Sequence, residues 1–179
     1  MEGTVTELKR LLVGGNICSG KSTLCRKLSS ELSIDLLSID DFRRKFGNGK
    51  SSGEARVWTE FLLAIEEADT SIIEATSGGP FTHLLRHTLS SESDEFGYLF
   101  LDANVDTCSA RLFLRGFNTP YPDFGVDNFT VQKNISIELK SMFESEFWGS
   151  RSMRIDANTT IESLQDIALE QLRAKGWVR

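Results

Sequence analysis

The chain has 179 residues, of which 40% are hydrophobic and 26% are charged, and this is the composition of one ordinary globular domain. No apolar run approaches the ~18 residues that a membrane span needs, and the first residues lack a signal-peptide pattern, so we expect a cytoplasmic protein without a membrane partner. The net charge of −6 argues against a broad nucleic-acid-binding surface, although it is compatible with a short basic groove at Arg43, Arg44 and Lys45.

Five short apolar runs are typical of buried strands. They cover residues 8–13, 35–39, 71–75, 98–101 and 153–155. Helical patterns separate these runs, the first of them formed by Leu24, Leu28 and Leu32. Strands that alternate with helices predict a mostly parallel sheet with helices on both faces, within a single α/β domain covering residues 1–179.

Apolar residues at helical spacing predict four more helices. Their buried stripes include Val57 and Phe61, Leu84 and Leu85, Val105 and Cys108, and Ile135 and Leu139. Residues 47–53, 76–80 and 116–128 are rich in Gly or Pro and are expected to be loops. The segment 159–162, Thr-Thr-Ile-Glu, has the pattern of a capping box that opens a terminal helix.

The most informative motif is the segment Gly15-Asn16-Ile17-Cys18-Ser19-Gly20-Lys21-Ser22, which has the pattern G-x-x-x-x-G-K-[ST]. It lies between a predicted strand and a predicted helix, so a helix N-terminus would face a bound phosphate. The loop amides, with Thr23 just behind them, would hold the phosphates of ATP, Lys21 would reach the β- and γ-phosphates, and the Ser22 hydroxyl would bind Mg²⁺. The motif predicts a nucleoside triphosphate site and leaves the choice between ATP and GTP open.

The three cysteines are Cys18, Cys25 and Cys108. They are odd in number and form no C-x-x-C pair, so we expect them to be reduced. Cys18 lies inside the phosphate loop, and a helix N-terminus lowers the pKa of a thiol, so this residue is a candidate for oxidation. A small residue that simply fits the loop is the alternative.

The second predicted strand ends in Asp40-Asp41-Phe42-Arg43. Ligands of parallel α/β sheets lie beyond the carboxyl ends of the strands, so a carboxylate here can accept the proton of an attacking hydroxyl. Asp40 is the preferred base, Asp41 is the alternative, and Arg43 would contact the acceptor or the transferring phosphoryl group. Asp40 could instead cap the helix that follows.

The phosphate loop together with the segment Ser-Ile-Asp40-Asp41-Phe-Arg43 resembles the polynucleotide 5′-hydroxyl kinases, whose corresponding segment is Arg-Asp-Asp-Tyr-Arg. In that family the first Asp is the general base and the Arg binds the acceptor, roles that the resemblance transfers to Asp40 and Arg43. Glu74-Ala75-Thr76 is similar to the Asp-Thr-Asn segment that ends the third strand there. The likeness is specific over about 14–44 and architectural beyond.

The chain also resembles the shikimate kinases, which have a carboxylate after strand two and a Gly-Glu pair on the helix that follows it, here Gly53-Glu54. They also have glycines after strand three, here Gly78-Gly79. Their Asp-x-Asp pattern is not matched by the adjacent Asp40-Asp41. Both families belong to the nucleoside-monophosphate-kinase-like group of P-loop kinases. The resemblance implies a three-layer P-loop kinase fold with a five-stranded parallel sheet in the order 2-3-1-4-5.

Arg111 and Arg115 are four residues apart, so they share one helix face just before the Pro-containing loop. Kinases of this group carry arginines at the edges of a lid that closes over ATP, which implies a lid at approximately 111–128. Guanidinium groups suit the dispersed charge of a phosphoryl-transfer transition state. The alternative is a pair of surface arginines.

Glu74 and Asp102 close the third and fourth predicted strands. Either carboxylate could hold Mg²⁺ through water, as the second acidic element of a P-loop site.

Together these patterns predict a P-loop kinase that transfers the γ-phosphoryl group of ATP to a hydroxyl of a nucleoside, nucleotide or nucleic acid. A small-metabolite kinase is the first alternative. An NTPase or switch without a phosphoryl acceptor is the second, although the chain lacks the Asn/Thr-Lys-x-Asp segment that reads guanine in GTPases. A regulator that binds ATP without catalysis is the third. The sequence predicts neither the acceptor's identity nor an oligomeric state.

Overall fold

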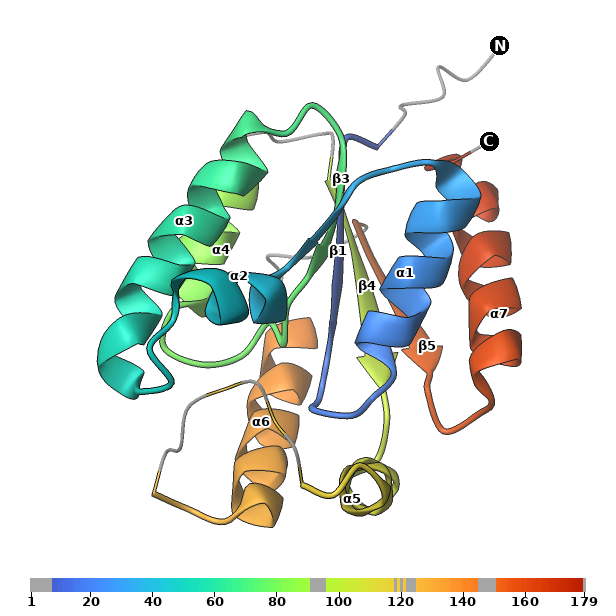
Figure 1. The fold of residues 1–179 in the computed structure, drawn as a ribbon. Coiled ribbons are helices and arrows are strands. Elements are labelled where there is room, and N and C mark those ends of the chain that lie inside the picture. Colours follow the sequence, from blue (N-terminus) through green and yellow to red (C-terminus); the bar gives the residue numbers. More distant parts are fainter. Residues whose placement is uncertain are drawn as a thin grey trace, which may run out of the picture.

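The computed structural model describes residues 8–90, 96–117, 119, 121, 125–144 and 151–178, which form a parallel sheet between two layers of helices (Figure 1). Within these residues the strands are β1 (Arg10–Gly15), β2 (Leu36–Ser38), β3 (Ser71–Glu74), β4 (Phe96–Asp102) and β5 (Ser152–Asp156). Their order is β2-β3-β1-β4-β5, and every neighbouring pair is parallel. The predicted order 2-3-1-4-5 is therefore confirmed.

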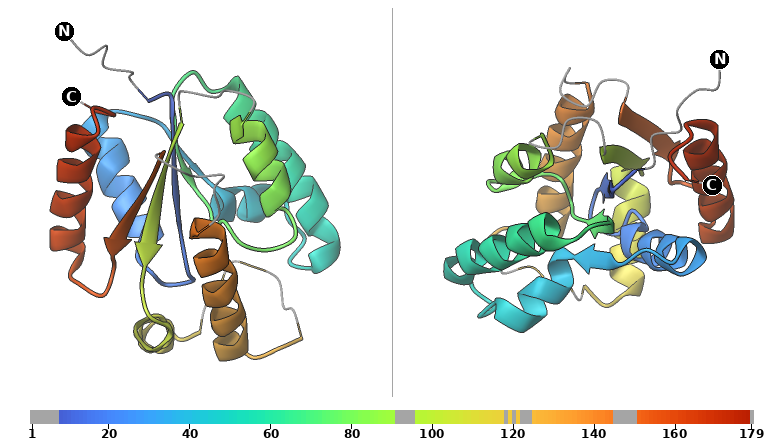
Figure 2. Two further views of the ribbon diagram at one scale, coloured as in Figure 1. Left: turned by 180° about the vertical axis from the view of Figure 1, so that it is seen from behind. Right: turned by 90° about the horizontal axis from the view of Figure 1, so that it is seen from above.

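Helices cover both faces of this sheet (Figure 2). They are α1 (Lys21–Leu32), α2 (Ile39–Phe46), α3 (Glu54–Glu67), α4 (Thr82–Ser90), α5 (Val105–Leu114), α6 (Asn128–Phe143) and α7 (Ile161–Ala174), with a 3₁₀ turn at Ser51–Gly53. Helices α1 and α7 lie on one face, and α3, α4 and α6 lie on the other (Figure 1). Helix α5 lies beyond the carboxyl end of β4, so it stands beside the edge where the strands end.

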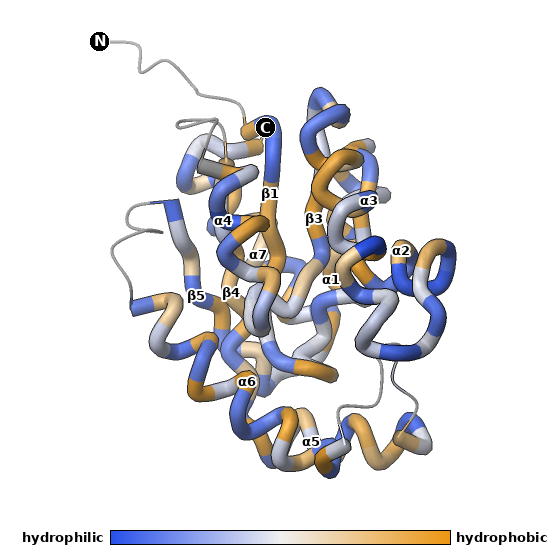
Figure 3. Tube along the Cα trace, turned by 90° about the vertical axis from the view of Figure 1, so that its left-hand side faces the viewer, coloured by the Kyte–Doolittle hydropathy of each residue, from blue (hydrophilic) through white to orange (hydrophobic). Residues whose placement is uncertain are grey.

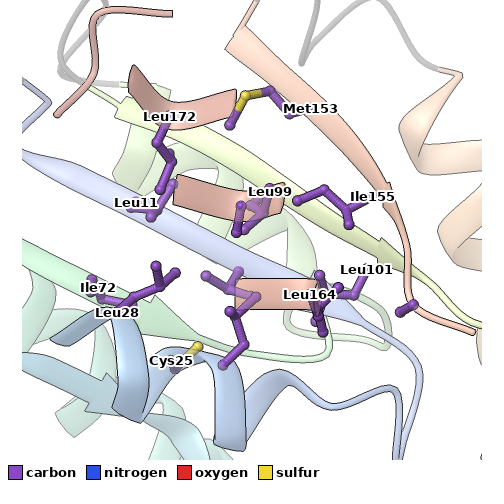
Figure 4. Close-up of a cluster of buried hydrophobic side chains, with 14 of the residues drawn as sticks. Leu11, Cys25, Leu28, Ile72, Leu99, Leu101, Met153, Ile155, Leu164 and Leu172 are labelled. Carbon is purple, nitrogen blue, oxygen red and sulfur yellow. The ribbon is translucent and has the colours of Figure 1, made fainter. Parts of the chain in front are cut away.

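The sheet is hydrophobic on both faces because both are covered. Successive residues of β1 point to opposite sides: Leu11 and Val13 pack with α1 and α7, and Leu12 packs with the helices of the other face. Figure 4 shows the first of these clusters, in which Leu28 of α1 and Leu172 of α7 meet the strands. Replacing a fully buried leucine such as Leu12 by alanine should cost about 2–5 kcal/mol of stability.

Hydropathy follows these layers. In Figure 3 the strands β1 and β4 are mostly hydrophobic, whereas the helices alternate between hydrophobic and hydrophilic residues. This pattern is what the sequence periodicity predicted for buried parallel strands and half-buried helices. None of the helices in the described parts of the chain is both long and apolar enough to span a membrane.

Most predicted strand boundaries differ from the structure by one or two residues, and three of the differences have a clear local reason. Strand β1 continues to Gly15, because Gly14 and Gly15 pair with Phe100 and Leu101 of β4. These glycines have no side chains, so the hydropathy pattern did not mark them as strand residues. Strand β2 ends at Ser38, so the predicted strand residue Ile39 opens α2. The capping-box prediction was wrong by one residue: Thr160, not Thr159, caps α7 and accepts from the Ser163 amide.

Candidate functional site

The loop between β1 and α1 has the backbone shape of an anion cradle. Gly20 has φ +105°, which an L side chain adopts only with strain. A Cβ on Gly15 would stand 2.8 Å from the Leu101 carbonyl oxygen, so β4 leaves no room for a side chain there. Cys18 also has a positive φ, of 63°, so the middle of the loop turns sharply. The two glycines of the motif are thus explained by geometry.

The N-terminus of α1 fits a polyphosphate. The first amides of a helix have no partner within it, and in α1, whose residues are all described, no side chain caps them and no acidic residue lies in the first turn. The Lys21 ammonium donates to the Asn16 carbonyl oxygen at 2.7 Å, so the lysine bends back over the loop. These amides and Lys21 form the donor set that an anion needs at a helix N-terminus.

A buried network ties this loop to α6. The Asn16 amide nitrogen donates to the Gln132 carbonyl oxygen at 2.9 Å, and the Gln132 side chain donates to the Ile17 carbonyl oxygen at 3.4 Å. Gln132 also accepts from the Ser109 hydroxyl at 2.7 Å, and its side chain is completely buried. Sequence reasoning missed Gln132, since a lone glutamine in an amphipathic helix carries no pattern. The structure makes it a positioning residue for the phosphate loop.

A cavity of about 690 Å³ opens on the outer side of the loop, toward α5 and α7. Its walls include Cys18 to Thr23 of the loop and α1, together with Arg26, Arg111, Arg115, Thr160 and Leu164. Asn16 instead lies behind the loop, 2% exposed, and Ile17 faces the opposite side of the site. The predicted nucleotide-binding residues therefore divide into cavity-lining residues and residues that shape the loop. We call this cavity the donor cavity.

The two predicted arginines of α5 have different surroundings. Arg111 donates to the carbonyl oxygens of Cys18 and Ser19, both at 3.3 Å, and to those of Ala157 at 3.1 Å and Thr159 at 3.3 Å. It thus joins the phosphate loop to the segment between β5 and α7. Arg115 is exposed and contacts the Cys18 sulfur at 3.4 Å, so it remains available to a ligand.

Part of the expected lid around 111–128 lies outside the described residues, at 118, 120 and 122–124. Its first four residues are the last turn of α5, and its end is the start of α6.

The structure separates the two candidate metal carboxylates. Glu74, at the end of β3, accepts a hydrogen bond from the Ser22 hydroxyl, so an oxygen pair suited to Mg²⁺ stands next to the phosphate loop. Asp102 is bound by Arg154, whose Nε lies 2.9 Å from it, and it lines neither the donor cavity nor the space around Ser22. Among the described residues no three His, Cys, Asp or Glu side chains cluster as a metal site.

Asp40 and Asp41 also lie in different places. Both belong to the first turn of α2, where a carboxylate is favourable. Asp41 is 62% exposed and pairs with Arg44 at 2.5 Å, on the outside of the helix. Asp40 is 28% exposed and lines a small cavity of about 50 Å³ together with Lys21, Ser22 and Glu74. We call this the junction cavity. Asp40 is therefore the carboxylate that faces the phosphate loop.

Arg43 is held between two carboxylates. Its Nη1 lies 3.0 Å from Asp40, and its Nη2 lies 2.8 Å from Glu54 at the start of α3. Burial acts to lower the pKa of the Arg43 guanidinium, but the hydrogen bonds and charges of Glu54 and Asp40 outweigh it and raise that pKa above its ordinary value. The permanent cation fixes the position of Asp40 beside the junction cavity.

A third cavity, of about 390 Å³, opens on the other side of the junction. It shares Ile39, Arg43, Thr76 and Tyr121 with the junction cavity, and Cys18, Lys21, Ser22 and Arg115 connect the junction to the donor cavity. The three spaces thus follow one another, with Lys21 and Asp40 between the two large ones. We call the third space the acceptor cavity.

No model of a protein family matches the sequence, and no curated protein is similar enough in sequence to match. Solved structures do match. A shikimate kinase from Acinetobacter baumannii in complex with shikimate has a TM-score of 0.69 at 18% identity, over 94% of this chain and 93% of that one.

A gluconokinase from Sinorhizobium meliloti 1021 has a TM-score of 0.66 at 12% identity, over 95% of this chain and 93% of that one. A deoxyadenosine kinase from M. mycoides with bound dATP has a TM-score of 0.63 at 10% identity, over 92% of this chain and 99% of that one. Identities this low show a common fold and not a common activity. The chain has the P-loop kinase fold, and its resemblance to polynucleotide kinases stays a prediction.

Proposed function

We propose that this protein is a cytoplasmic kinase that transfers the γ-phosphoryl group of ATP to an alcohol. One observation carries the proposal: the junction cavity brings Lys21, Ser22, Glu74 and Asp40 together between two larger cavities. A donor on one side and a hydroxyl on the other would meet there. A switch or NTPase has no need of the second cavity.

Each residue has a defined part in this reaction. The loop amides, Lys21 and Arg115 bind the triphosphate, and Asp40 accepts the proton of the acceptor hydroxyl. The hydroxyl oxygen forms a bond to the γ-phosphorus as the bond to the β,γ-bridging oxygen breaks, and ADP leaves. Ser22 and Glu74 would hold Mg²⁺, which offsets the charge of the phosphate oxygens when it is bound.

The acceptor class is inferred from the segment after β2 and from the similar solved structures. The Asp40-Asp41-Phe42-Arg43 segment favours a nucleoside, nucleotide or nucleic acid, and the similar solved structures include kinases named for a nucleoside and for small metabolites. A small-metabolite kinase is therefore the second candidate.

The test measures ADP formation from ATP in the presence of Mg²⁺, with and without candidate acceptors. The acceptor panel contains nucleosides, sugars, hydroxy acids, amino alcohols and 5′-hydroxyl oligonucleotides. Acceptor-dependent ADP release with a phosphorylated product is the expected result. The same ADP release without any acceptor would instead identify an NTPase.

A further inference from the structure

The acceptor cavity is largely apolar. Trp58 of α3 and Phe81 form one wall, with ring centroids 5.6 Å apart and planes 18° from parallel. The other apolar lining residues come from the phosphate loop, α2, the loop after β3, the segment before α6 and α6 itself. In that order they are Ile17, Ile39, Pro80, Val126, and Val131 with Ile135. Such walls suit an acceptor with an apolar or aromatic body.

The cavity offers no uncompensated positive charge. Arg43 is the one Lys or Arg among the described residues that line it. All three of its guanidinium nitrogens donate to carboxylates, Nη1 to Asp40 and the other two to Glu54. A phosphate or carboxylate group entering this space would meet a cation whose charge Glu54 and Asp40 already offset.

A second carboxylate faces the cavity from α6. One oxygen of Glu138 accepts from the Gly79 amide at 2.8 Å. Its other oxygen would stand 3.2 Å from a Cβ on Gly78, so it lies against the loop after β3. Within the described part of the chain no Lys or Arg pairs with Glu138. The cavity lining thus has one guanidinium, Arg43, against two carboxylates, Glu54 and Glu138.

We propose that the acceptor of the proposed kinase reaction carries no phosphate or carboxylate in this cavity, and that Glu138 binds an N–H, O–H or ammonium group of it. The inference rests on the proposed function and narrows its acceptor class. Nucleosides and amino alcohols with an apolar body have this chemistry. Mononucleotides, hydroxy acids and sugar acids do not, because their anionic group would face a net negative wall.

Matched acceptors test the charge rule. Adenosine is compared with adenosine 3′-monophosphate, and an aryl amino alcohol is compared with the hydroxy acid of the same carbon skeleton. Binding is measured by calorimetry in the presence of a non-hydrolysable ATP analogue, and phosphorylation is measured separately. We expect the uncharged or ammonium member of each pair to bind at least about tenfold tighter, the effect of one charged contact. Tighter binding of the anionic members overturns the inference.

Glu138 variants separate binding from loop support. Glu138→Gln keeps an oxygen for the Gly79 amide but removes the charge, so we expect an unchanged melting temperature, an affinity for the amino alcohol about tenfold weaker, and kcat within about threefold. Glu138→Lys should shift the preference toward the hydroxy acid. Glu144→Gln is the matched control, because Glu144 is the exposed C-cap residue of the same helix. It should change nothing.

The outcomes distinguish the two proposals. Unchanged acceptor selectivity in both Glu138 variants would mean that this residue only supports the loop, and the inference would fail while the kinase assignment stood. Tight ATP binding with no phosphorylated product from any acceptor would overturn the proposed function itself.

Discussion

The donor and acceptor cavities are built in opposite ways. One wall of the donor cavity comes from consecutive residues, Cys18 to Thr23, whose backbone amides would bind phosphate in the proposed reaction. The acceptor cavity is lined mainly by side chains from α2, α3, the loop after β3 and α6, which are far apart in the sequence. A backbone site can be recognised from a short motif, whereas a side-chain site exists only once distant elements pack together.

Their charges differ as well. Lys21, Arg26, Arg111 and Arg115 line the donor cavity, whose lining contains no Asp or Glu among the described residues. The acceptor cavity has Arg43 opposed by Glu54 and Glu138. One space suits a polyphosphate, and the other suits a ligand without negative charge. The substitutions below test this difference between the two cavities and the link between them.

Lys21→Ala should have the largest effect, reducing phosphoryl transfer to background. Removing one preorganised donor to transition-state charge typically costs about 10²–10³-fold in kcat, and Lys21 also binds the ground-state phosphates. The measurement is kcat beside the melting temperature, which should hold because, among the described residues, the ammonium donates to the loop carbonyl oxygen of Asn16 and not into the core. Lys27→Ala, on the same helix, is the control. A kcat within threefold of the parent would remove the loop from the reaction.

Asp40→Asn should follow, lowering kcat about 10²–10⁴-fold while ATP affinity changes little, because a lost general base acts on the chemical step. Asp41→Asn removes only an exposed pair with Arg44 and should leave kcat near the parent value. If the Asp41 variant is the more damaging one, the base has been placed one residue too early.

Gln132→Ala tests how the packing of α6 supports the phosphate loop between the donor and acceptor cavities. The change leaves the Ile17 carbonyl oxygen and the Ser109 hydroxyl without this partner, so the free energy of unfolding should fall by about 1–3 kcal/mol. ATP affinity should fall more than acceptor affinity, since the loop loses its support. Lys133→Ala, its exposed neighbour, is the control for both measurements. Equal losses on the two sides would point to general destabilisation.

The smallest effect concerns the cysteines, which are all free, as predicted. Burial raises the pKa of the Cys108 thiol to about 11, and burial followed by the nearby Glu74 charge raises that of Cys25 well above its ordinary value. Both thiols therefore stay protonated and unreactive at neutral pH. Between pH 7 and 9 an alkylating reagent should modify one cysteine, Cys18, as peptide mass spectrometry would show.

An ATP analogue with Mg²⁺ should slow this modification, because Cys18 lines the donor cavity. Rapid labelling of Cys108 would show that α5 opens away from the sheet. Cys18→Ser should abolish the fast reaction and keep kcat within about threefold.

Much of the fold could be predicted from the sequence, because buried parallel strands and half-buried helices have distinct apolar periods. The strand order was inferred from the family resemblance and is confirmed. The end of β1 was missed because Gly14 and Gly15 contribute backbone pairing without side-chain pattern. The cap of α7 was misplaced because two successive threonines both fit the cap pattern.

The sequence by itself determined the phosphate loop, since eight consecutive residues carry both its shape and its donors. It also named Glu74 and Asp102 as equal metal candidates, and it preferred Asp40 to Asp41 as the base. The tertiary structure separates the metal candidates, because β3 places Glu74 against Ser22, and it shows why the two aspartates differ, because α2 turns Asp40 inward and Asp41 outward. Gln132 and Glu138 could not be predicted as site residues, because their positions depend on how α6 packs against segments more than fifty residues away in the chain.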